Sequence, residues 1–244
     1  MNTPWYSSFA LLGLLGMLLS GCARTASTQD DGDPLERYSF TDGLDKAVLT
    51  PVARTYVRIT PKRVRTGVTN FFDNVGYINV IANDLLQGKI VQGVGDTARF
   101  AINSTVGIGG LFDPANRLGL VKNEEDPGQT LGRWGFAEGA YLVVPLRGSN
   151  SLRDAPDLVM SPLLNPLFYV SSVVALPVAA LGAVNQRANL LEATRIRDEA
   201  ALDAYSFTPE AYRQNRTYEI YDGNPPVESL EYAGDEEASE LKVN

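Results

Sequence analysis

Hydrophobic residues recur with the period of an α-helix through much of the first half of the chain. Four segments show this spacing: residues 44–56, 64–75, 77–88 and 89–105. Pro51 interrupts the first segment, where a kink is expected, and Pro61 lies where the second helix would begin. Gly88 is a suitable end for the third segment, because glycine readily takes the left-handed conformation that follows a helix. The pattern therefore predicts a mostly α-helical fold.

A run without charged side chains lies in the second half. It covers the 29 residues Leu158–Gln186, which is long enough to cross a bilayer. It is interrupted by Pro162, Pro166 and Pro177. Polar groups lie within it at Asn165, Ser171 and Ser172. A broken helical hairpin with apolar sides fits this pattern better than one straight transmembrane helix, and a buried core hairpin of a soluble domain is the alternative.

The start of the chain resembles an export signal. An apolar stretch, residues 9–20, is too short for a comfortable membrane span and ends at Gly21 and Cys22. We expect residues 1–21 to be removed as a signal peptide. The last four residues of this region, Leu19–Cys22, resemble the lipobox of bacterial lipoproteins, whose cysteine becomes the acylated N-terminus. Because Cys22 is the only cysteine, lipidation is preferred over a free or buried thiol, and an internal disulfide is excluded.

Both flanks of the central region are polar and acidic. Residues 22–32 are expected to form a tether, and residues 223–244 an acidic, disordered tail. The net charge of the 244-residue chain is -8, which argues against a general nucleic-acid binder because phosphate contacts need a basic surface. The densest basic cluster is Lys62, Arg63 and Arg65. It is either a solvated helix face or a contact for anionic lipid headgroups.

Several kinds of enzyme are excluded by composition. The chain has no histidine, so Ser-His and Cys-His activation is not available. The carboxylates of Glu124, Glu125 and Asp126 are expected in a solvated turn. The glycines near position 109 lack the order that nucleotide-binding loops need. We therefore expect a protein that is not an enzyme and uses no cofactor or metal.

Motifs along the chain resemble one family of lipoproteins. The matching residues are Asp33–Glu36, Asn70–Phe72, Arg99–Thr105, Gly107, Gly109–Asp113, Gly128–Gly132, Gly135, Tyr141–Leu146, Gly148–Ser149, Arg153–Asp154, Arg187–Ala188, Tyr212, Arg216 and Tyr221–Pro226. In this order they resemble the signature of the MlaA (VacJ) phospholipid-transport lipoproteins. The resemblance covers nearly the whole chain that follows the expected signal peptide.

The resemblance implies a fold and a place in the cell. It implies that residues 33–222 form a helical disc embedded in the outer membrane from its periplasmic side, around an amphipathic channel. The hairpin, with Asn165, Ser171 and Ser172, would form part of the channel wall and rim. Asp154 and Asp157 would lie near its polar entrance. Where the family usually carries a Phe-x-Phe-Asn element close to the lipid path, this sequence has a shorter segment containing Phe40 and Thr41.

The resemblance also implies an activity and partners. Phospholipids misplaced in the outer leaflet would enter the channel and be passed to a periplasmic carrier protein, which maintains the lipid asymmetry of the outer membrane. Trimeric porins would bind the protein, and their walls would support the disc. The alternatives are a porin-associated structural lipoprotein that moves no lipid, and a tethered soluble lipid carrier.

Overall fold

The computed structural model describes residues 43–144, 148–200 and 204–226 of the chain; for residues 197–200 and 204–208 it describes the backbone. Several predictions fall outside these ranges: the signal peptide (residues 1–21), the acylated Cys22, the tether (residues 22–32), Phe40, Thr41 and the tail from residue 227 onward. They stay predictions.

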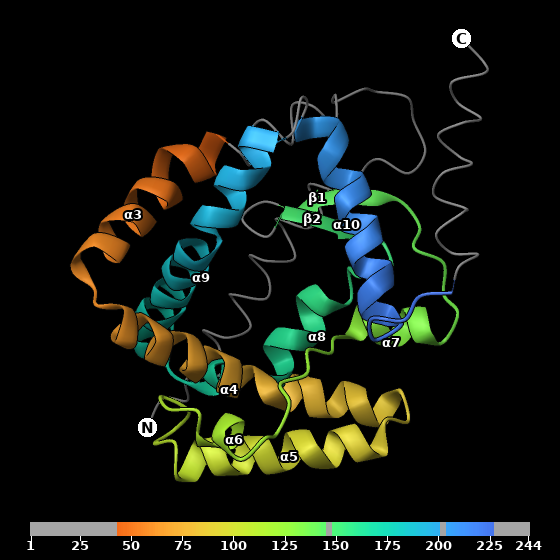
Figure 1. The fold of residues 1–244 in the computed structure, drawn as a ribbon, viewed down its shortest axis with the longest axis horizontal. Coiled ribbons are helices and arrows are strands. Elements are labelled where there is room, and N and C mark those ends of the chain that lie inside the picture. The colour runs from red at the N-terminus through yellow and green to blue at the C-terminus, as the bar shows by residue number, and fades with distance from the viewer. Residues whose placement is uncertain (1–42, 145–147, 201–203, 227–244) are drawn as a thin grey trace, which may run out of the picture.

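The described part of the chain is mostly helical, as predicted (Figure 1). Its elements are the π-helix η1 (Asp45–Leu49), α3 (Thr50–Ile59), α4 (Lys62–Leu86), α5 (Ile90–Thr105), α6 (Pro114–Arg117), α7 (Pro127–Arg133), β1 (Tyr141–Val144), β2 (Gly148–Ser151), α8 (Asp157–Leu164), the 3₁₀-helix η2 (Pro166–Tyr169), α9 (Ser172–Ala200) and α10 (Ala204–Ile220).

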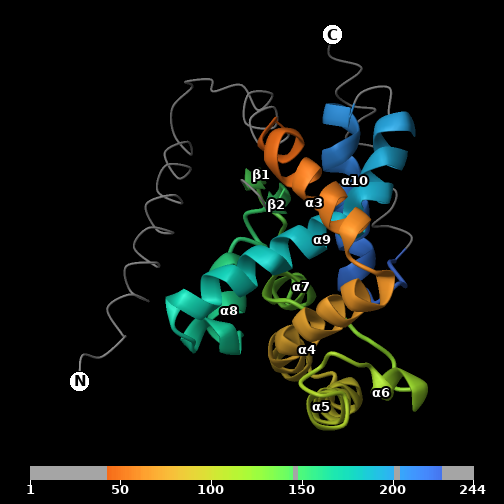
Figure 2. The same cartoon turned by 90° about the vertical axis from the view of Figure 1, so that its left-hand side faces the viewer.

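The helices are arranged around α4, the helix that most others contact. Helix α5 folds back along it, α9 and α8 pack against its other parts, and α3 lies alongside α9. Helix α10 packs against α7 and strand β2 at the opposite side of the molecule from α3. Figure 2 shows the α4–α5 pair at one end and the α8–α9 hairpin as an arm extending to one side. The described chain therefore has two sides, one built by α3 and α9 and one by α7 and α10.

Helix α4 joins two segments that the sequence pattern separates. It runs for 25 residues without interruption and ends near Gly88, as predicted. Gly88 has φ +75°, its N–H donates to Leu85 O (3.1 Å), and the N–H of Lys89 donates to Asp84 O (2.8 Å). These two bonds form a Schellman motif, which satisfies the last carbonyls of the helix.

The proline at position 51 is accommodated by a π-helical turn. The N–H of Thr50 donates to Asp45 O, five residues earlier, and α3 continues directly from this turn. A wider turn before a proline fits a residue that has no N–H to donate to an α-helical ladder.

The predicted broken hairpin is present as α8, η2 and α9. Pro162 lies within α8, and the Asn165 side chain caps η2 by accepting from the N–H of Leu167 (2.9 Å). Pro177 lies within α9, which continues past the apolar run into the following amphipathic segment. Across the described ranges, every helix falls short of the length and apolar character that crossing a membrane requires.

Strands β1 and β2 are not predicted by the helical pattern. They form an antiparallel pair in which Tyr141 faces Ser151 and Val144 faces Gly148. Aromatic and β-branched residues of β1 favour an extended chain, but four residues are too few to give a recognisable period.

Candidate functional site

Helix α5 shows which kind of side chain the protein buries. On its inner side, facing α4, Asp96, Arg99 and Asn103 are at most 5% exposed. On its outer side Val91 and Val94 are 90% and 66% exposed. The apolar stripe that marks this segment as a helix in the sequence is therefore its exposed face, which is the reverse of the usual arrangement in a water-soluble helix.

The same reversal extends over the described chain. The hydrophobic residues with buried side chains are few: Ala53, Tyr77, Ala115, Ala188 and Ile220. Buried polar and charged residues are more numerous, and large hydrophobic residues are exposed on α3, α5, the hairpin and the loops between them. Large exposed apolar surfaces mark contact with a membrane or with another protein.

Two fully buried carboxylates lie between α4 and α5. Asp84 and Asp96 are both 0% exposed, and each has one oxygen without a hydrogen-bond partner. Gln92 donates to Asp84 Oδ1 (2.8 Å), and Asn123 donates to Asp96 Oδ2 (3.0 Å). Burial, reinforced by the neighbouring Asp96 and Glu125, raises the pKa of Asp84 to about 7. The pair can therefore share a proton near neutral pH.

Glu125 connects this pair to the loop before α7. Its carboxylate accepts from Lys89 Nζ (2.6 Å), Gln92 Nε2 (2.7 Å) and Gln87 Nε2 (2.8 Å), and the residue is 5% exposed. The sequence-based prediction of a solvated turn is therefore wrong for Glu125, because side chains from α4 and α5 surround it. Glu124, whose side chain is 78% exposed, fits that prediction.

A chain of hydrogen bonds leads from α7 through uncharged side chains to the carboxylate of Asp157 in the hairpin. Thr130 Oγ1 donates to Asn83 Oδ1 (2.7 Å), and Asn83 Nδ2 donates to Asn79 Oδ1 (3.1 Å). Asn79 Nδ2 donates to Ser161 Oγ (3.0 Å), which in turn donates to Asp157 Oδ1. These contacts join the buried polar groups of α4 to the first arm of the hairpin.

Arg216 forms the centre of a second buried network. Its guanidinium makes two hydrogen bonds to Asp154, Nε to Oδ2 (3.1 Å) and Nη2 to Oδ1 (3.0 Å). It also binds Asp126 through Nη1 (2.7 Å to Oδ2) and Nη2. Arg216 is 8% exposed and Asp154 4%. Such bidentate, charge-assisted pairs are among the strongest polar contacts in proteins.

The surroundings of Asp154 fix its charge. Burial alone would raise its pKa, but hydrogen bonds from Arg216, Tyr212 and Ser151 and the positive charge of Arg216 lower the pKa below its usual value. Burial and the neighbouring carboxylate raise the pKa of Tyr212, so its hydroxyl stays protonated and donates to Asp154. Gly128 leaves the necessary room, since a Cβ there would lie 2.0 Å from Asp154 Oδ1.

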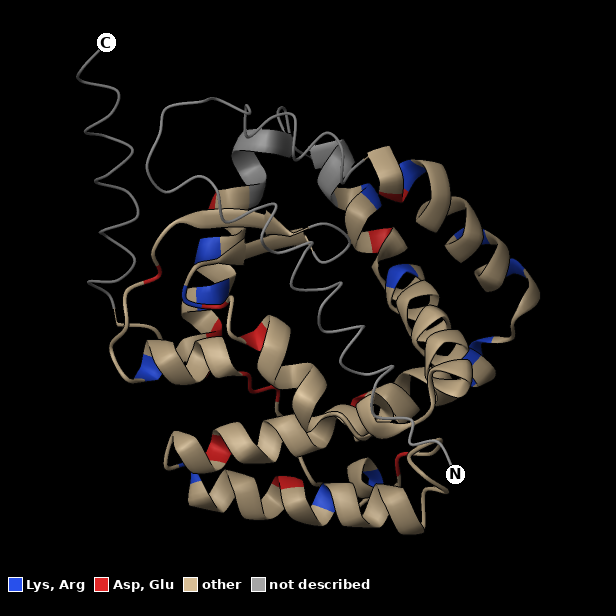
Figure 3. Ribbon diagram, turned by 180° about the vertical axis from the view of Figure 1, so that it is seen from behind, with Lys and Arg blue, Asp and Glu red and all other residues tan. Residues whose placement is uncertain are grey.

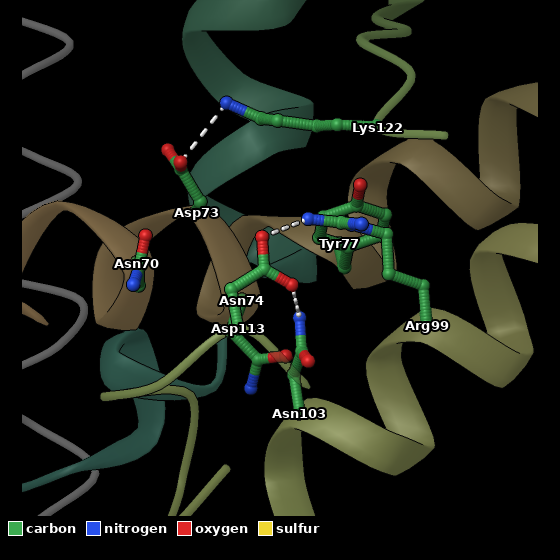
Figure 4. Close-up of a pocket in the computed structure, with 8 residues that line it drawn as sticks. All are labelled: Asn70, Asp73, Asn74, Tyr77, Arg99, Asn103, Asp113 and Lys122. Atoms are coloured by element: carbon green, nitrogen blue, oxygen red, sulfur yellow. Dashed lines mark hydrogen bonds and ion pairs between the residues drawn. The ribbon is translucent and has the colours of Figure 1, made fainter. Parts of the chain in front are cut away.

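A narrow polar pocket lies between α4, α5 and the loop that follows them (Figure 4). Arg99 binds Asp113 and donates to Leu120 O (2.7 Å), and its guanidinium carbon lies 5.8 Å from the ring centre of Tyr77. Asn103 donates to Asp113 Oδ1 (2.9 Å). Burial raises the pKa of Tyr77 to about 12, and its hydroxyl has no hydrogen-bond partner in the described chain. The polar lining and the unpartnered Tyr77 hydroxyl are features that favour a buried water over an empty cavity.

The site residues predicted from the sequence lie in different environments. Asp154 and Asp157 are both buried and belong to the two networks described above. Asn165 caps η2, Ser171 is exposed, and Ser172 begins α9. Their role in a lipid channel stays a prediction.

The predicted basic cluster divides in two. Lys62 and Arg63 are exposed at the start of α4, whereas Arg65 is half-buried and its Nε lacks a partner. A role in binding headgroups stays a prediction for all three.

Sequence reasoning missed the buried network of Asp84 and Asp96. A signal for it exists, because Asp96, Arg99 and Asn103 recur with helical spacing on the side opposite the apolar stripe. Arg216 and Tyr212 belong to the motifs that carry the family resemblance, but the sequence alone assigns them no partner. In the described ranges, no three His, Cys, Asp or Glu residues are grouped so that they could hold a metal ion.

Comparisons with known proteins agree on one family. The family model described as "MlaA lipoprotein" matches residues 32–219. The chain is 30% identical over 217 residues to the "Intermembrane phospholipid transport system lipoprotein MlaA" of Shigella flexneri, covering 85% of this chain and 86% of the relative. An uncharacterised protein of Rickettsia bellii is 34% identical over 191 residues, 75% of each chain.

A solved structure is also similar to this chain. It is described as "Structural basis for maintenance of bacterial outer membrane lipid asymmetry", with a TM-score of 0.66 and 29% sequence identity. The match covers 78% of this chain and 100% of the solved one.

Proposed function

This chain belongs to the MlaA lipoprotein family, and from that membership and its reversed polarity we propose that it removes misplaced phospholipids from the outer leaflet of the outer membrane. Relatives named for intermembrane phospholipid transport and a similar structure described for outer-membrane lipid asymmetry support this assignment. The chain would act as part of a system that maintains that asymmetry.

The observation that carries the proposal is the combination of an apolar exterior and a polar interior. Val173 and Val91 are 84% and 90% exposed, whereas Asp84, Asp96 and Ser151 are 0% exposed. In water this arrangement leaves large apolar areas exposed, and each exposed Å² costs about 25 cal/mol of free energy. Hydrocarbon would cover them without that cost. A protein that lies among lipid tails needs this apolar exterior, and its polar groups are then kept inside, away from the tails.

We propose the following route. The chain is anchored through the acylated Cys22 on the periplasmic side of the outer membrane and embedded there. Lipids enter an amphipathic channel, with the hairpin as part of its wall, Asn165, Ser171 and Ser172 on the rim, and Asp154 and Asp157 near its polar end. The segment with Phe40 and Thr41 would lie close to the lipid path.

Transfer is passive in this proposal. The chain forms and breaks no covalent bond and uses no cofactor, and it hands lipids to a periplasmic carrier protein while trimeric porins support it in the membrane. The alternative is a porin-associated structural lipoprotein without transport.

The test measures outer-leaflet phospholipid in cells that lack this chain, by the reaction of its amine headgroups with a reagent that does not cross the membrane. We expect the accessible fraction to rise on deletion, to return to the starting level with the wild-type chain, and to stay high with Cys22→Ala. An unchanged fraction on deletion would contradict transport. Loss of porin trimers together with an unchanged fraction would support the structural alternative.

A further inference from the structure

The segment from residue 46 to residue 72 differs in charge from the rest of the chain. It contains six of the 21 Lys and Arg residues and not one Asp or Glu, in a chain with a net charge of -8. The segment includes α3, the corner at Thr60 and Pro61, and the first half of α4. Figure 3 shows the blue positions that follow one another along these two helices.

Four of these cations are exposed and lack an acidic partner. Arg54, Arg58, Lys62 and Arg63 have exposed side chains and form no ion pair within the part of the chain that the structure describes. Outside the segment, all the described Lys and Arg side chains except that of Arg117 are in ion pairs. The positive charge of this region is therefore not neutralised within the described chain.

Exposed apolar residues lie beside the cations. Val52 and Ile59, seven positions apart and so on one face of α3, are 46% and 73% exposed, and Val64 at the start of α4 is 53% exposed. The side of α3 that faces α9 is occupied, since Ala53 is 0% exposed and Tyr56, one turn after Val52, donates to Asn185 of α9 (3.1 Å). The outer face is therefore free to bind something that is both apolar and anionic.

The positions of Lys62 and Arg63 do not stabilise helix α4. They occupy the first turn of α4, which has no acidic residue and no side-chain cap, and cations are unfavourable near the positive end of a helix dipole. An anion near this turn would remove the unfavourable interaction.

We propose that this outer face, formed by Val52, Arg54, Arg58, Ile59, Lys62, Arg63 and Val64, binds the surface of a leaflet that contains anionic phospholipid. The apolar side chains enter the boundary between headgroups and acyl chains, and the cations bind phosphates, as in helices that lie in the plane of a membrane. The face holds the α3 side of the molecule against the leaflet and concentrates anionic lipid beside the protein. The inference rests on the proposed placement at a membrane and adds a preference for headgroup charge.

The first experiment uses the full mature chain, purified in a non-ionic detergent, with equal amounts of phosphatidylglycerol and phosphatidylethanolamine. Native mass spectrometry then counts the bound molecules of each lipid. We expect phosphatidylglycerol to be preferred, and the preference to fall about tenfold or more in the variant Arg54→Gln/Arg58→Gln/Lys62→Gln/Arg63→Gln. The matched control, Arg117→Gln/Arg133→Gln/Arg195→Gln/Arg213→Gln, removes the same charge elsewhere and should keep the preference.

Equal loss in both variants would overturn the proposal, because net charge rather than this face would then explain binding. Equal binding of the two lipids by the wild-type chain would also overturn the proposal. So would binding of an acidic protein to this face without any preference between the two lipids. The readout is made on purified protein, so it can fail while the chain still removes lipid in cells, and the reverse also holds.

A second measurement reports the depth of the face and does not require the fourfold variant to fold. Ile59→Trp in a Trp134→Phe background places the only tryptophan of the mature chain on this face. In vesicles of phosphatidylethanolamine with a minor share of phosphatidylglycerol, brominated phosphatidylglycerol should quench it more strongly than the same amount of brominated phosphatidylethanolamine. Equal quenching, or none, would contradict the proposal.

Discussion

The α7–α10 side of the molecule and the α8–α9 hairpin expose opposite kinds of side chain to solvent. Around α10, Arg216 and Asp154 are at most 8% exposed and bind each other, so two charges are removed from solvent. On the hairpin, Val173 and Leu176 are 84% and 56% exposed, so apolar surface is left open. In a water-soluble protein both arrangements would be unfavourable.

The difference teaches where the stability of this fold originates. With few buried hydrophobic side chains in the described ranges, the helices are held together by networks of hydrogen bonds and ion pairs. Such networks lose stability when one member is removed, because its buried partners are then left without a hydrogen bond. The exposed apolar side chains stabilise the protein only when another apolar phase covers them. Substitutions on the two sides should therefore affect different properties.

The largest effect is expected from breaking the Arg216 network. Arg216→Met should lower the free energy of unfolding by roughly 3–5 kcal/mol, because half-buried Asp126 would lose its counter-charge and buried Asp154 would keep only the single contact with Arg153 (3.3 Å). Denaturant unfolding in detergent, followed by circular dichroism, measures this loss. Arg213→Met is the control, since its pair with Glu138 is long (3.7 Å) and about half-exposed, and it should change stability by at most about 1 kcal/mol. Similar losses for the two variants would contradict the comparison.

A smaller loss is expected when the space beside the network is filled. A Cβ at Gly128 would lie 2.0 Å from Asp154 Oδ1 and 2.4 Å from Arg216 Nη2. Gly128→Ala should therefore destabilise the protein by about 1–3 kcal/mol, through displacement of both side chains. Gly95→Ala in α5, where a Cβ would meet nothing within 4 Å, should instead stabilise it by about 0.5–1 kcal/mol. The same unfolding measurement separates them, and a loss at Gly95 would indicate a general intolerance of helix substitutions.

The carboxylate pair allows a prediction that depends on pH. The pKa of Asp84 is raised to about 7 in the folded state, above its value in the unfolded chain, because burial and the nearby Asp96 and Glu125 disfavour its charge. The folded protein thus binds more protons than the unfolded chain between about pH 4 and pH 7. Stability from this group is fully present below that window and lost as pH rises through it.

Asp84→Asn keeps a neutral side chain at every pH. Relative to the wild-type chain it should therefore gain stability as pH rises from about 4 to about 7. The gain should be smaller than the loss at Arg216, since Asp84 and Asp96 can share one proton between them. Unfolding curves of both proteins at four or so pH values test this, with Asp73→Asn as a control because Asp73 is exposed enough to remain in contact with solvent. A difference between Asp84→Asn and wild type that does not change with pH would show that Asp84 is charged throughout.

Periodicity predicts the helices of this protein well. Apolar and polar residues lie on different faces of each helix, so they recur with the helical period whichever face is buried. The spacing in residues 89–105 predicts α5 correctly, even though the apolar face turns out to be exposed. Gly88 predicts the end of α4 and Pro166 the start of η2, because the backbone preferences of glycine and proline act locally. The expected interruptions at Pro162 and Pro177 are wrong, since α8 and α9 continue through these residues. Strands β1 and β2 are not predicted, because strands of four residues are too short to show an alternating pattern.

The site is predicted less completely than the helices. Family motifs indicate Arg153, Asp154, Tyr212 and Arg216, but only the folded chain shows that Arg216 lies between Asp154 and Asp126, residues 62 and 90 positions away. Glu125 appears solvated in the sequence because its partners, Lys89 and Gln92, come from an earlier part of the chain. Pairing across such distances leaves no local signal.

The smallest effect on stability, and the sharpest test of the comparison, is expected on the hairpin. Val173→Ser/Leu176→Ser removes two exposed apolar side chains and should change the free energy of unfolding in detergent by no more than about 0.5 kcal/mol for each site. Ile220→Ser, the control, makes the same kind of exchange at a side chain that is 6% exposed and packs against Gly132, and should cost about 2–5 kcal/mol.

The order of the two variants should reverse for association with membranes, measured as the fraction of purified chain that floats with vesicles. The hairpin variant should lose association while Ile220→Ser, where it folds, retains it. If the hairpin variant loses stability and keeps its association, the exposed valines and leucines stabilise the fold itself, and the apolar exterior would no longer support a place among lipid tails.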